Sequence, residues 1–193
     1  MLHPIHLNTE NMCITIIGGG KIAFRKCRFF LTDRKQITVV SKHFISEFDT
    51  INTQVKLIHD TYKAEYIKNS LIVIAATDNP KLNLEIANYC KQHQKLINIA
   101  NDSVLSNFII PAHIRRGSLL LSTSTCGKSP SLTAKIKQEL EITYDDSYEH
   151  YVNLLGEARK KILATVNDPI TRKAQLNQLI NLSLEELENL KRN

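Results

Sequence analysis

The segment Cys13-Ile-Thr-Ile-Ile-Gly-Gly-Gly-Lys-Ile-Ala23 decides the fold class of this chain. Its first five residues are mostly β-branched and apolar, which predicts a buried strand, and the three glycines after them predict a tight turn. From Lys21 to Thr32 apolar side chains recur with the spacing of a helix. A strand that leads through a glycine turn into a helix is how a parallel α/β unit begins.

The glycine turn also fits the dinucleotide-binding pattern G-x-G-x-x-G/A. Gly18 permits the sharp turn, Gly20 lets the backbone approach a pyrophosphate, and Ala23 allows close packing of helix on strand. The helix N-terminus supplies N–H groups and a partial positive charge for the phosphates. The alternative is a glycine turn with no ligand. We predict a dinucleotide bound by Gly18, Gly19, Gly20, Lys21 and Ile22.

Four more strands are predicted to complete the sheet, and a second helix is predicted between the last two of them. Strands are expected at 36–40, 55–58, 70–76 and 96–100. The third of these is apolar throughout, which suits the middle of a parallel sheet covered on both faces. Asp78 or Asn79 is the expected N-cap of a helix that Pro80 opens and that runs to about Gln92. The order of strands and helices predicts right-handed crossovers.

The pattern changes after Pro111. Phe108–Ile110 and Ser118–Ser122 are expected to be short strands separated by basic Arg115-Arg-Gly117. Pro130 opens a helix to about Ile142, and further helices are expected at 148–164, 169–181 and 184–191. Asp168 is the expected N-cap of the second of these, and Ser183-Leu-Glu-Glu186 is a capping box. We predict an α/β protein of three parts: a nucleotide-binding domain at 1–112, a short β-rich connector at 113–143, and a helical region at 144–193.

The choice of cofactor depends on the residues at the end of the second strand. An Asp or Glu that would bind both ribose hydroxyls of NAD is missing there, and Ser41, Lys42 and His43 take its place. Ser41 can hydrogen-bond a ribose hydroxyl, whereas Lys42 and His43 can tolerate a 2′-phosphate. We expect NAD rather than NADP, and we expect Thr77, at the end of a strand, to contact it.

Composition and charge narrow the class of protein. The chain is 42% hydrophobic and 23% charged, which is typical of globular proteins. Its longest apolar run, Leu71–Ala76, is too short to cross a bilayer, and its first residues lack the layout of a secretory signal, so we expect a cytoplasmic protein. The four cysteines lack metal or redox spacing, and we predict no metal site. The net charge of +6 suits an anionic ligand, and we expect neither nucleic acid nor a membrane as partner.

Several segments together resemble the precorrin-2 dehydrogenases, the family of siroheme-synthase N-terminal domains. The resemblance spans roughly Leu7 to Glu149, and its most specific part is the last, because ordinary dinucleotide-binding dehydrogenases lack it. The segments are Ile17–Lys26, Ile74–Asn79 with Asn83, Ile97–Asp102 leading to Phe108–Ala112, and Ile114–Ser118 with Ser122–Pro130.

The resemblance implies a Rossmann domain, a dimerisation segment whose strands interlock with a partner chain, and a helical tail, and therefore a homodimer. It also implies NAD-dependent oxidation of the tetrapyrrole precorrin-2 to sirohydrochlorin. In that reaction NAD⁺ accepts a hydride and a base or water takes a proton. A separate chelatase is a candidate to receive the product.

The resemblance carries site residues with it. The family's acid–base aspartate aligns with Asn101, and Asp102 comes next in the chain. Asn cannot take a proton at neutral pH, so the alternatives are Asp102, solvent, or a substrate so easily oxidised that it needs no strong base; we favour the last two. Ser129 matches the family's loop serine, and N-capping the helix at Pro130 can coexist with a catalytic role. Arg115, Arg116 and Lys128 would attract the substrate's carboxylates.

Two other functions remain as alternatives. Some family members also insert Fe²⁺ into sirohydrochlorin, and the candidate groups for that step, Asp102 and His113, form no convincing pair. A non-enzymatic NAD-sensing module would account for the Rossmann half and the missing base. It would not account for the segment Ser124-Thr-Cys-Gly-Lys-Ser-Pro130.

Overall fold

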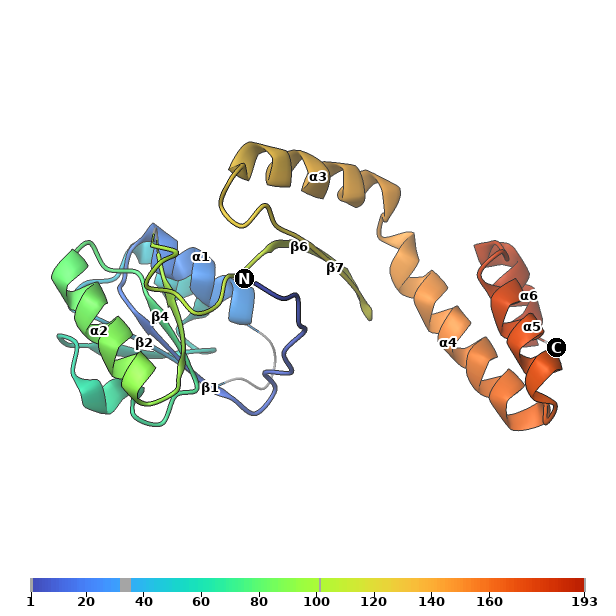
Figure 1. Cartoon of the computed structure of the whole chain (residues 1–193), viewed down its shortest axis with the longest axis horizontal. Helices are drawn as coiled ribbons and strands as arrows, with labels where there is room; N and C mark the ends of the chain where they lie inside the picture. Colours follow the sequence, from blue (N-terminus) through green and yellow to red (C-terminus); the bar gives the residue numbers. More distant parts are fainter. Residues whose placement is uncertain (1, 32–35, 101, 193) are drawn as a thin grey trace. The chain divides into compact units, whose positions relative to one another are not determined.

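The computed structural model describes residues 2–31, 36–100 and 102–192. The chain divides into two compact units, Met1–Ile110 and Pro111–Asn193. Each unit has its own secondary structure and its own packing (Figure 1). None of the helices in the described residues is long and apolar enough to cross a membrane.

The first unit is a five-stranded parallel sheet with the strand order β3-β2-β1-β4-β5. The strands are β1 (Cys13–Ile17), β2 (Gln36–Ser41), β3 (Lys56–His59), β4 (Ile72–Ala75) and β5 (Leu96–Ile99). The helices are α1 (Lys21–Phe30) and α2 (Pro80–Gln92), with short 3₁₀ turns η1 (Ser46–Ile51) and η2 (Ala64–Ile67). The predicted parallel α/β sheet is confirmed, and β1 and β4 lie side by side at its centre.

Two hydrophobic clusters cover the two faces of this sheet. On one face, Ile72 and Ile74 of β4 pack in the cluster that contains Ala23 and Cys27 of α1. On the other face, Val73 and Ala75 belong to a cluster formed with α2. Because successive side chains of a strand point to opposite faces, a strand between two helices must be apolar at every position. This explains the continuous apolar run in β4.

The segment after β5 corrects one prediction, because Phe108–Ile110 is not a strand. The chain turns back along β5, and side chains take the place of a paired strand. The Ile97 N–H donates to Asn107 Oδ1 (2.8 Å), the Ile99 N–H donates to Ser106 Oγ (2.8 Å), and Asn107 Nδ2 donates to the Lys95 carbonyl (2.8 Å). The outer edge of β5 is therefore hydrogen-bonded without a sixth strand.

The second unit begins with an antiparallel hairpin, β6 (Ala112–Arg116) paired with β7 (Leu119–Thr123). Gly117, with φ +54°, occupies its turn. The prediction that Arg115 and Arg116 lie in a loop between two strands is therefore wrong, because both belong to β6. The structure confines the turn to Gly117 and Ser118, and the backbone adopts its positive φ at Gly117.

Four helices come after the hairpin: α3 (Pro130–Thr143), α4 (Ser147–Thr165), α5 (Pro169–Leu179) and α6 (Leu184–Arg192). The last three pack around Leu154, Leu179 and Leu187. The predicted caps are confirmed: Asp168 accepts from the Thr171 N–H (2.7 Å), and Ser183 and Glu186 form the reciprocal capping box. Short polar signals thus set where these helices begin.

We expect Asn107→Ala to lower the free energy of unfolding by about 1.5 kcal/mol, because it removes two hydrogen bonds that complete the edge of β5. Urea unfolding followed by circular dichroism measures this loss. Asn69→Ala, at an exposed turn residue, is the matched control and should cost less than about 0.5 kcal/mol. Equal losses in the two variants would show that Asn107 does not support β5.

Candidate dinucleotide-binding site

Two of the three glycines in the turn after β1 are held against neighbouring strands. Gly18 has φ +128°, and a Cβ there would overlap the carbonyl oxygen of Ala76. A Cβ on Gly19 would overlap the carbonyl oxygen of His43 and lie 2.8 Å from Ser41 Oγ. The turn therefore fits between the ends of β2 and β4 only as glycine.

Gly20 differs, because a Cβ built on it meets nothing within 4 Å. It is the N-cap of α1, no side chain caps this end of the helix, and the first turn holds no acidic residue. The N–H groups of such a turn carry partial positive charge and need a hydrogen-bond acceptor. Open space beside a bare helix N-terminus fits a pyrophosphate.

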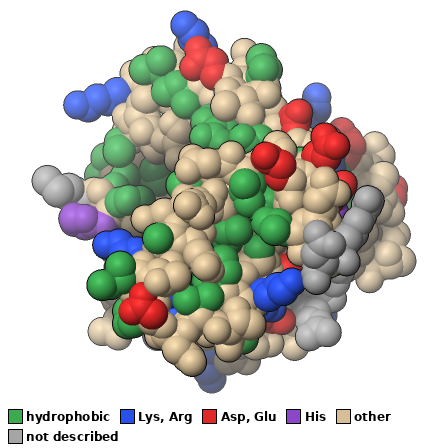
Figure 2. Space-filling model, turned by 90° about the vertical axis from the view of Figure 1, so that its right-hand side faces the viewer, with side chains coloured by type: hydrophobic (Ala, Val, Ile, Leu, Met, Phe, Trp, Pro, Cys, Tyr) green, Lys and Arg blue, Asp and Glu red, His purple; other side chains and the backbone are tan. Residues whose placement is uncertain are grey.

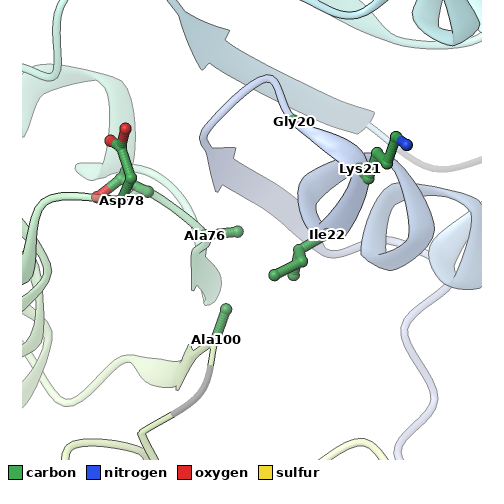
Figure 3. A pocket seen from close by; sticks show the side chains of 7 residues that line it. Gly20, Lys21, Ile22, Ala76, Asp78 and Ala100 are labelled. Atoms are coloured by element: carbon green, nitrogen blue, oxygen red, sulfur yellow. The ribbon is translucent and has the colours of Figure 1, made fainter.

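A hollow of about 380 Å³ lies in front of this helix end. Figure 3 shows Ile22 of α1 pointing toward Ala76 and Ala100 across the gap, while the Lys21 side chain points away. The lining residues are Gly20, Lys21, Ile22, Ala76, Thr77, Asp78 and Ala100. Among the predicted cofactor residues, Lys21 can therefore contribute here through its backbone rather than its ammonium group.

A larger hollow of about 700 Å³, here called the main groove, runs past the C-terminal ends of the strands. It is lined by the glycine turn, by 41–45 after β2, by 60–62 after β3, and by 76–79 with Leu82. The structure thus brings Ser41, Lys42, His43 and Thr77 together with the glycines. Ser41 Oγ donates to the His43 carbonyl (2.7 Å), so this hydroxyl holds its own loop in shape.

Asp60, Thr61 and Tyr62 line the main groove but were absent from the sequence prediction. Their position is set by the register of the sheet, in which His59 of β3 pairs with Ser41 of β2. The ends of adjacent parallel strands meet at one edge. Once β3 was recognised, the residues after it were therefore candidates.

A buried asparagine fixes the loop after β4. Thr77 Oγ1 donates to Asn83 Oδ1 (2.7 Å), and Asn83 Nδ2 donates back to the Thr77 carbonyl (3.1 Å). Asn79 is the N-cap of α2, since its side chain accepts from the Lys81 and Leu82 N–H groups. Asp78, the other expected cap, instead lines both hollows.

The catalytic candidates of the first unit lie after β5. Asn101 falls outside the described residues. Asp102 Oδ1 accepts from the N–H groups of Val104 (2.9 Å) and Leu105 (3.0 Å), so its carboxylate caps a turn. Of the described residues in this segment, Ala100 lines the smaller hollow and Asp102 does not.

The remaining candidates belong to the second unit. Ser129 is the N-cap of α3 and accepts from the Leu132 N–H (3.3 Å), and Thr125 Oγ1 also accepts from the Ser129 N–H (2.9 Å). Arg115 and Lys128 are exposed. Arg116 is partly buried and forms an ion pair with the exposed Asp146, its Nε lying 3.1 Å from Oδ1. Arg115 and Lys128 are thus the more accessible cations, whereas Arg116 ties the hairpin to the start of α4.

Two cysteines pack in the core of the first unit. Cys27 and Cys90 are buried, and burial raises the pKa of each thiol to about 11. Both thiols are therefore protonated and unreactive at neutral pH. Across the described parts of the chain, no three His, Cys, Asp or Glu side chains are grouped so that they could hold a metal ion.

A parallel sheet, a glycine turn and a bare helix N-terminus beside a groove define an NAD(P)-binding Rossmann domain. Residues 5–112 match a family described as "Putative NAD(P)-binding". The precorrin-2 dehydrogenase of Bacillus subtilis (strain 168) is 32% identical over 160 residues, which cover 82% of this chain and 98% of that protein. The chain belongs to the precorrin-2 dehydrogenase family, which includes the N-terminal domain of siroheme synthases.

Two further comparisons agree with this assignment. The solved structure of the precorrin-2 dehydrogenase SirC has a TM-score of 0.81 with this one, at 28% identity, and covers 99% of this chain and 98% of its own. The siroheme synthase of Pseudoalteromonas translucida (strain TAC 125) is 29% identical over 161 residues, 82% of this chain. The chain spans only 34% of the length of that longer protein.

Mutation can distinguish Gly20, which faces open space, from Gly19, which is packed against backbone. We expect Gly20→Ala to change the free energy of unfolding by less than about 1 kcal/mol, because its methyl group enters open space. The same methyl group should weaken NADH binding by more than about tenfold, because it occupies the approach of the pyrophosphate.

Gly19→Ala is the matched comparison and should destabilise the fold by more than about 2 kcal/mol, because its Cβ meets backbone. Fluorescence titration with NADH and urea unfolding measure the two effects. Undiminished NADH affinity in Gly20→Ala would contradict the placement of the pyrophosphate.

Proposed function

We propose that this chain catalyses the NAD-dependent oxidation of precorrin-2 to sirohydrochlorin. The open, uncapped turn at Gly20 carries the proposal, in a chain that matches almost the whole length of a precorrin-2 dehydrogenase. When bound, NAD⁺ supplies the acceptor for the hydride that leaves the substrate. The residues of the chain then have to bind this cofactor, attract an acidic tetrapyrrole and allow a proton to leave.

The cofactor is held mainly by backbone groups. The N–H groups at the start of α1 bind the pyrophosphate, and Gly18 and Gly19 keep that helix end pointed at the groove. Ser41, Lys42 and His43 line the adenosine end. The Asn83 amide orients the Thr77 hydroxyl and carbonyl, which lie where the two hollows meet.

The substrate is a polycarboxylate, and cationic side chains of the second unit can attract it. Arg115 and Lys128 are exposed, so their charges are available to substrate carboxylates. Arg116 is engaged with Asp146 and contributes less. Ser129 lies in the same loop as Lys128, and its hydroxyl already caps α3. We infer that Ser129 shapes this loop and presents Lys128.

We also infer that the chain works as a homodimer. None of the described residues of α3 is buried, and two of its large apolar side chains, Leu132 and Ile142, are 48% and 81% exposed. Figure 2 views the molecule from the side of α4–α6, where hydrophobic side chains also lie between charged ones. Apolar surface on a helix of this length is suited to covering by a second chain. Sedimentation of the intact chain distinguishes dimer from monomer.

The cytoplasmic location and transfer of product to a separate chelatase stay predictions.

The direct test mixes the intact protein with precorrin-2 and NAD⁺. We expect NADH absorbance and the visible band of sirohydrochlorin to rise together, because each turnover transfers one hydride. No change at saturating NAD⁺, in a protein that binds NADH, would favour the NAD-sensing alternative. Addition of Fe²⁺ or Co²⁺ to the product then tests the chelatase alternative by the loss of the sirohydrochlorin band.

The proton acceptor is tested by Asp102→Asn. The amide oxygen of Asn can still accept from the Val104 and Leu105 N–H groups, so the turn is preserved while the basic group is lost. We expect turnover to fall by less than about tenfold, because solvent takes the proton. Loss of a true general base usually costs about a hundredfold or more, and a decrease of that size would identify Asp102 as the acceptor.

A further inference from the structure

The adenosine end of the main groove carries a carboxylate that the dinucleotide pattern does not account for. After β2, where such patterns often place an acid, this chain has Ser41. The next strand supplies one instead. Ser41 pairs with His59 in the sheet, and the Asp60 N–H donates to the Ser41 carbonyl (3.1 Å). Asp60 therefore lies after β3, directly beside the end of β2.

Four donors from three residues hold the Asp60 carboxylate in place, and the weakest of them is the Thr61 hydroxyl, which donates to Oδ1 (3.3 Å). Oδ2 accepts from Lys63 Nζ (2.6 Å) and from the Tyr66 hydroxyl (2.5 Å), and Oδ1 accepts from the Thr61 N–H (2.7 Å). These hydrogen bonds, those from Lys63 and Tyr66 first, hold the pKa of Asp60 far below its usual range. The carboxylate is thus fixed in direction and charged throughout the neutral range.

Other charged side chains in the main groove also affect which cofactor binds. Lys42 and His43 lie on the same side as Asp60, and Asp78 lies on the loop after β4. Lys63, the partner of Asp60, is exposed and is not among the described residues that line the groove. Of this ion pair, Asp60 is therefore the member that lines the groove.

We propose that Asp60 selects NAD over NADP, acting as the acid that is absent after β2. The 2′-hydroxyl of NAD is uncharged and can donate a hydrogen bond to a carboxylate. The 2′-phosphate of NADP would bring negative charge to a fixed negative charge, and the like charges would repel. Lys42 and His43 alone would favour the phosphate, so Asp60 decides the preference. The inference rests on the proposed cofactor site.

The test compares the affinities for NADH and NADPH by fluorescence titration of the intact protein. The wild-type chain should bind NADH more tightly. Asp60→Asn keeps the size of the side chain and its acceptor oxygen for Thr61, and removes the charge. We expect the NADPH-to-NADH ratio of dissociation constants to fall by about tenfold in this variant.

Asp49→Asn is the matched control, since Asp49 is an exposed carboxylate of η1 that does not line the groove. Its ratio should stay at the wild-type value, although the net charge changes equally. Lys63→Gln removes the cation that compensates Asp60 and should raise the ratio, in the direction opposite to Asp60→Asn.

Three results would overturn the inference: equal ratios in Asp60→Asn and Asp49→Asn, a wild-type preference for NADPH, or shifts of Asp60→Asn and Lys63→Gln in the same direction. If Asp60→Asn does not fold, an unchanged ratio in Lys63→Gln overturns it alone. A wild-type chain that binds neither nucleotide contradicts the proposed function itself, so the two failures can be told apart.

Discussion

The close approach of Gly18 and Gly19 to the strand ends on either side of β1 is the contact on which the site depends. One glycine lies against the Ala76 carbonyl at the end of β4, and the other lies against the His43 carbonyl in the loop after β2. No side chain fits at either point. The contact sets the direction in which α1 leaves the turn, and it leaves Gly20 and the bare end of that helix facing open space.

Most of the proposed cofactor site is made of backbone, which polar side chains hold in place, and Asn83 is the buried one of these. Asn83 holds Thr77 through two hydrogen bonds, Asn79 caps α2, and Ser41 closes its own loop onto the His43 carbonyl. Because backbone groups bind most of the ligand, few positions in such a site require a particular side chain. In the proposed site, Asp60 after β3 takes the place of the acid that is absent at the end of β2, because the register of the sheet sets it beside Ser41.

The sequence was sufficient where a local signal decides the structure. The apolar run of β4, the glycine turn, and the caps at Asp168 and Ser183 each act over a few residues, and each was predicted correctly. Prediction failed where contacts between residues far apart in the sequence determine the local structure. Phe108–Ile110 is apolar and includes two β-branched residues, but the hydrogen bonds along β5 come from the Ser106 and Asn107 side chains, which leave no periodic pattern in the sequence.

The same reason explains why parts of the site were missed. The place of Asp60 is set by strand register, and the ion pair of Arg116 joins residues thirty positions apart, at Asp146. The sequence does not show whether a basic residue in a strand has an acidic partner in the folded chain. The pairing of Arg116 with Asp146 could therefore not be read from the sequence, and the role of Arg115, Arg116 and Lys128 toward substrate stays a prediction.

A crystal structure of the intact protein with NAD⁺ would test the role of the glycine turn without intermediate assumptions. We expect the pyrophosphate in front of Gly20, with its oxygens within hydrogen-bond distance of the backbone N–H groups at the start of α1. Electron density for the pyrophosphate elsewhere, with that helix end still bare, would contradict this role.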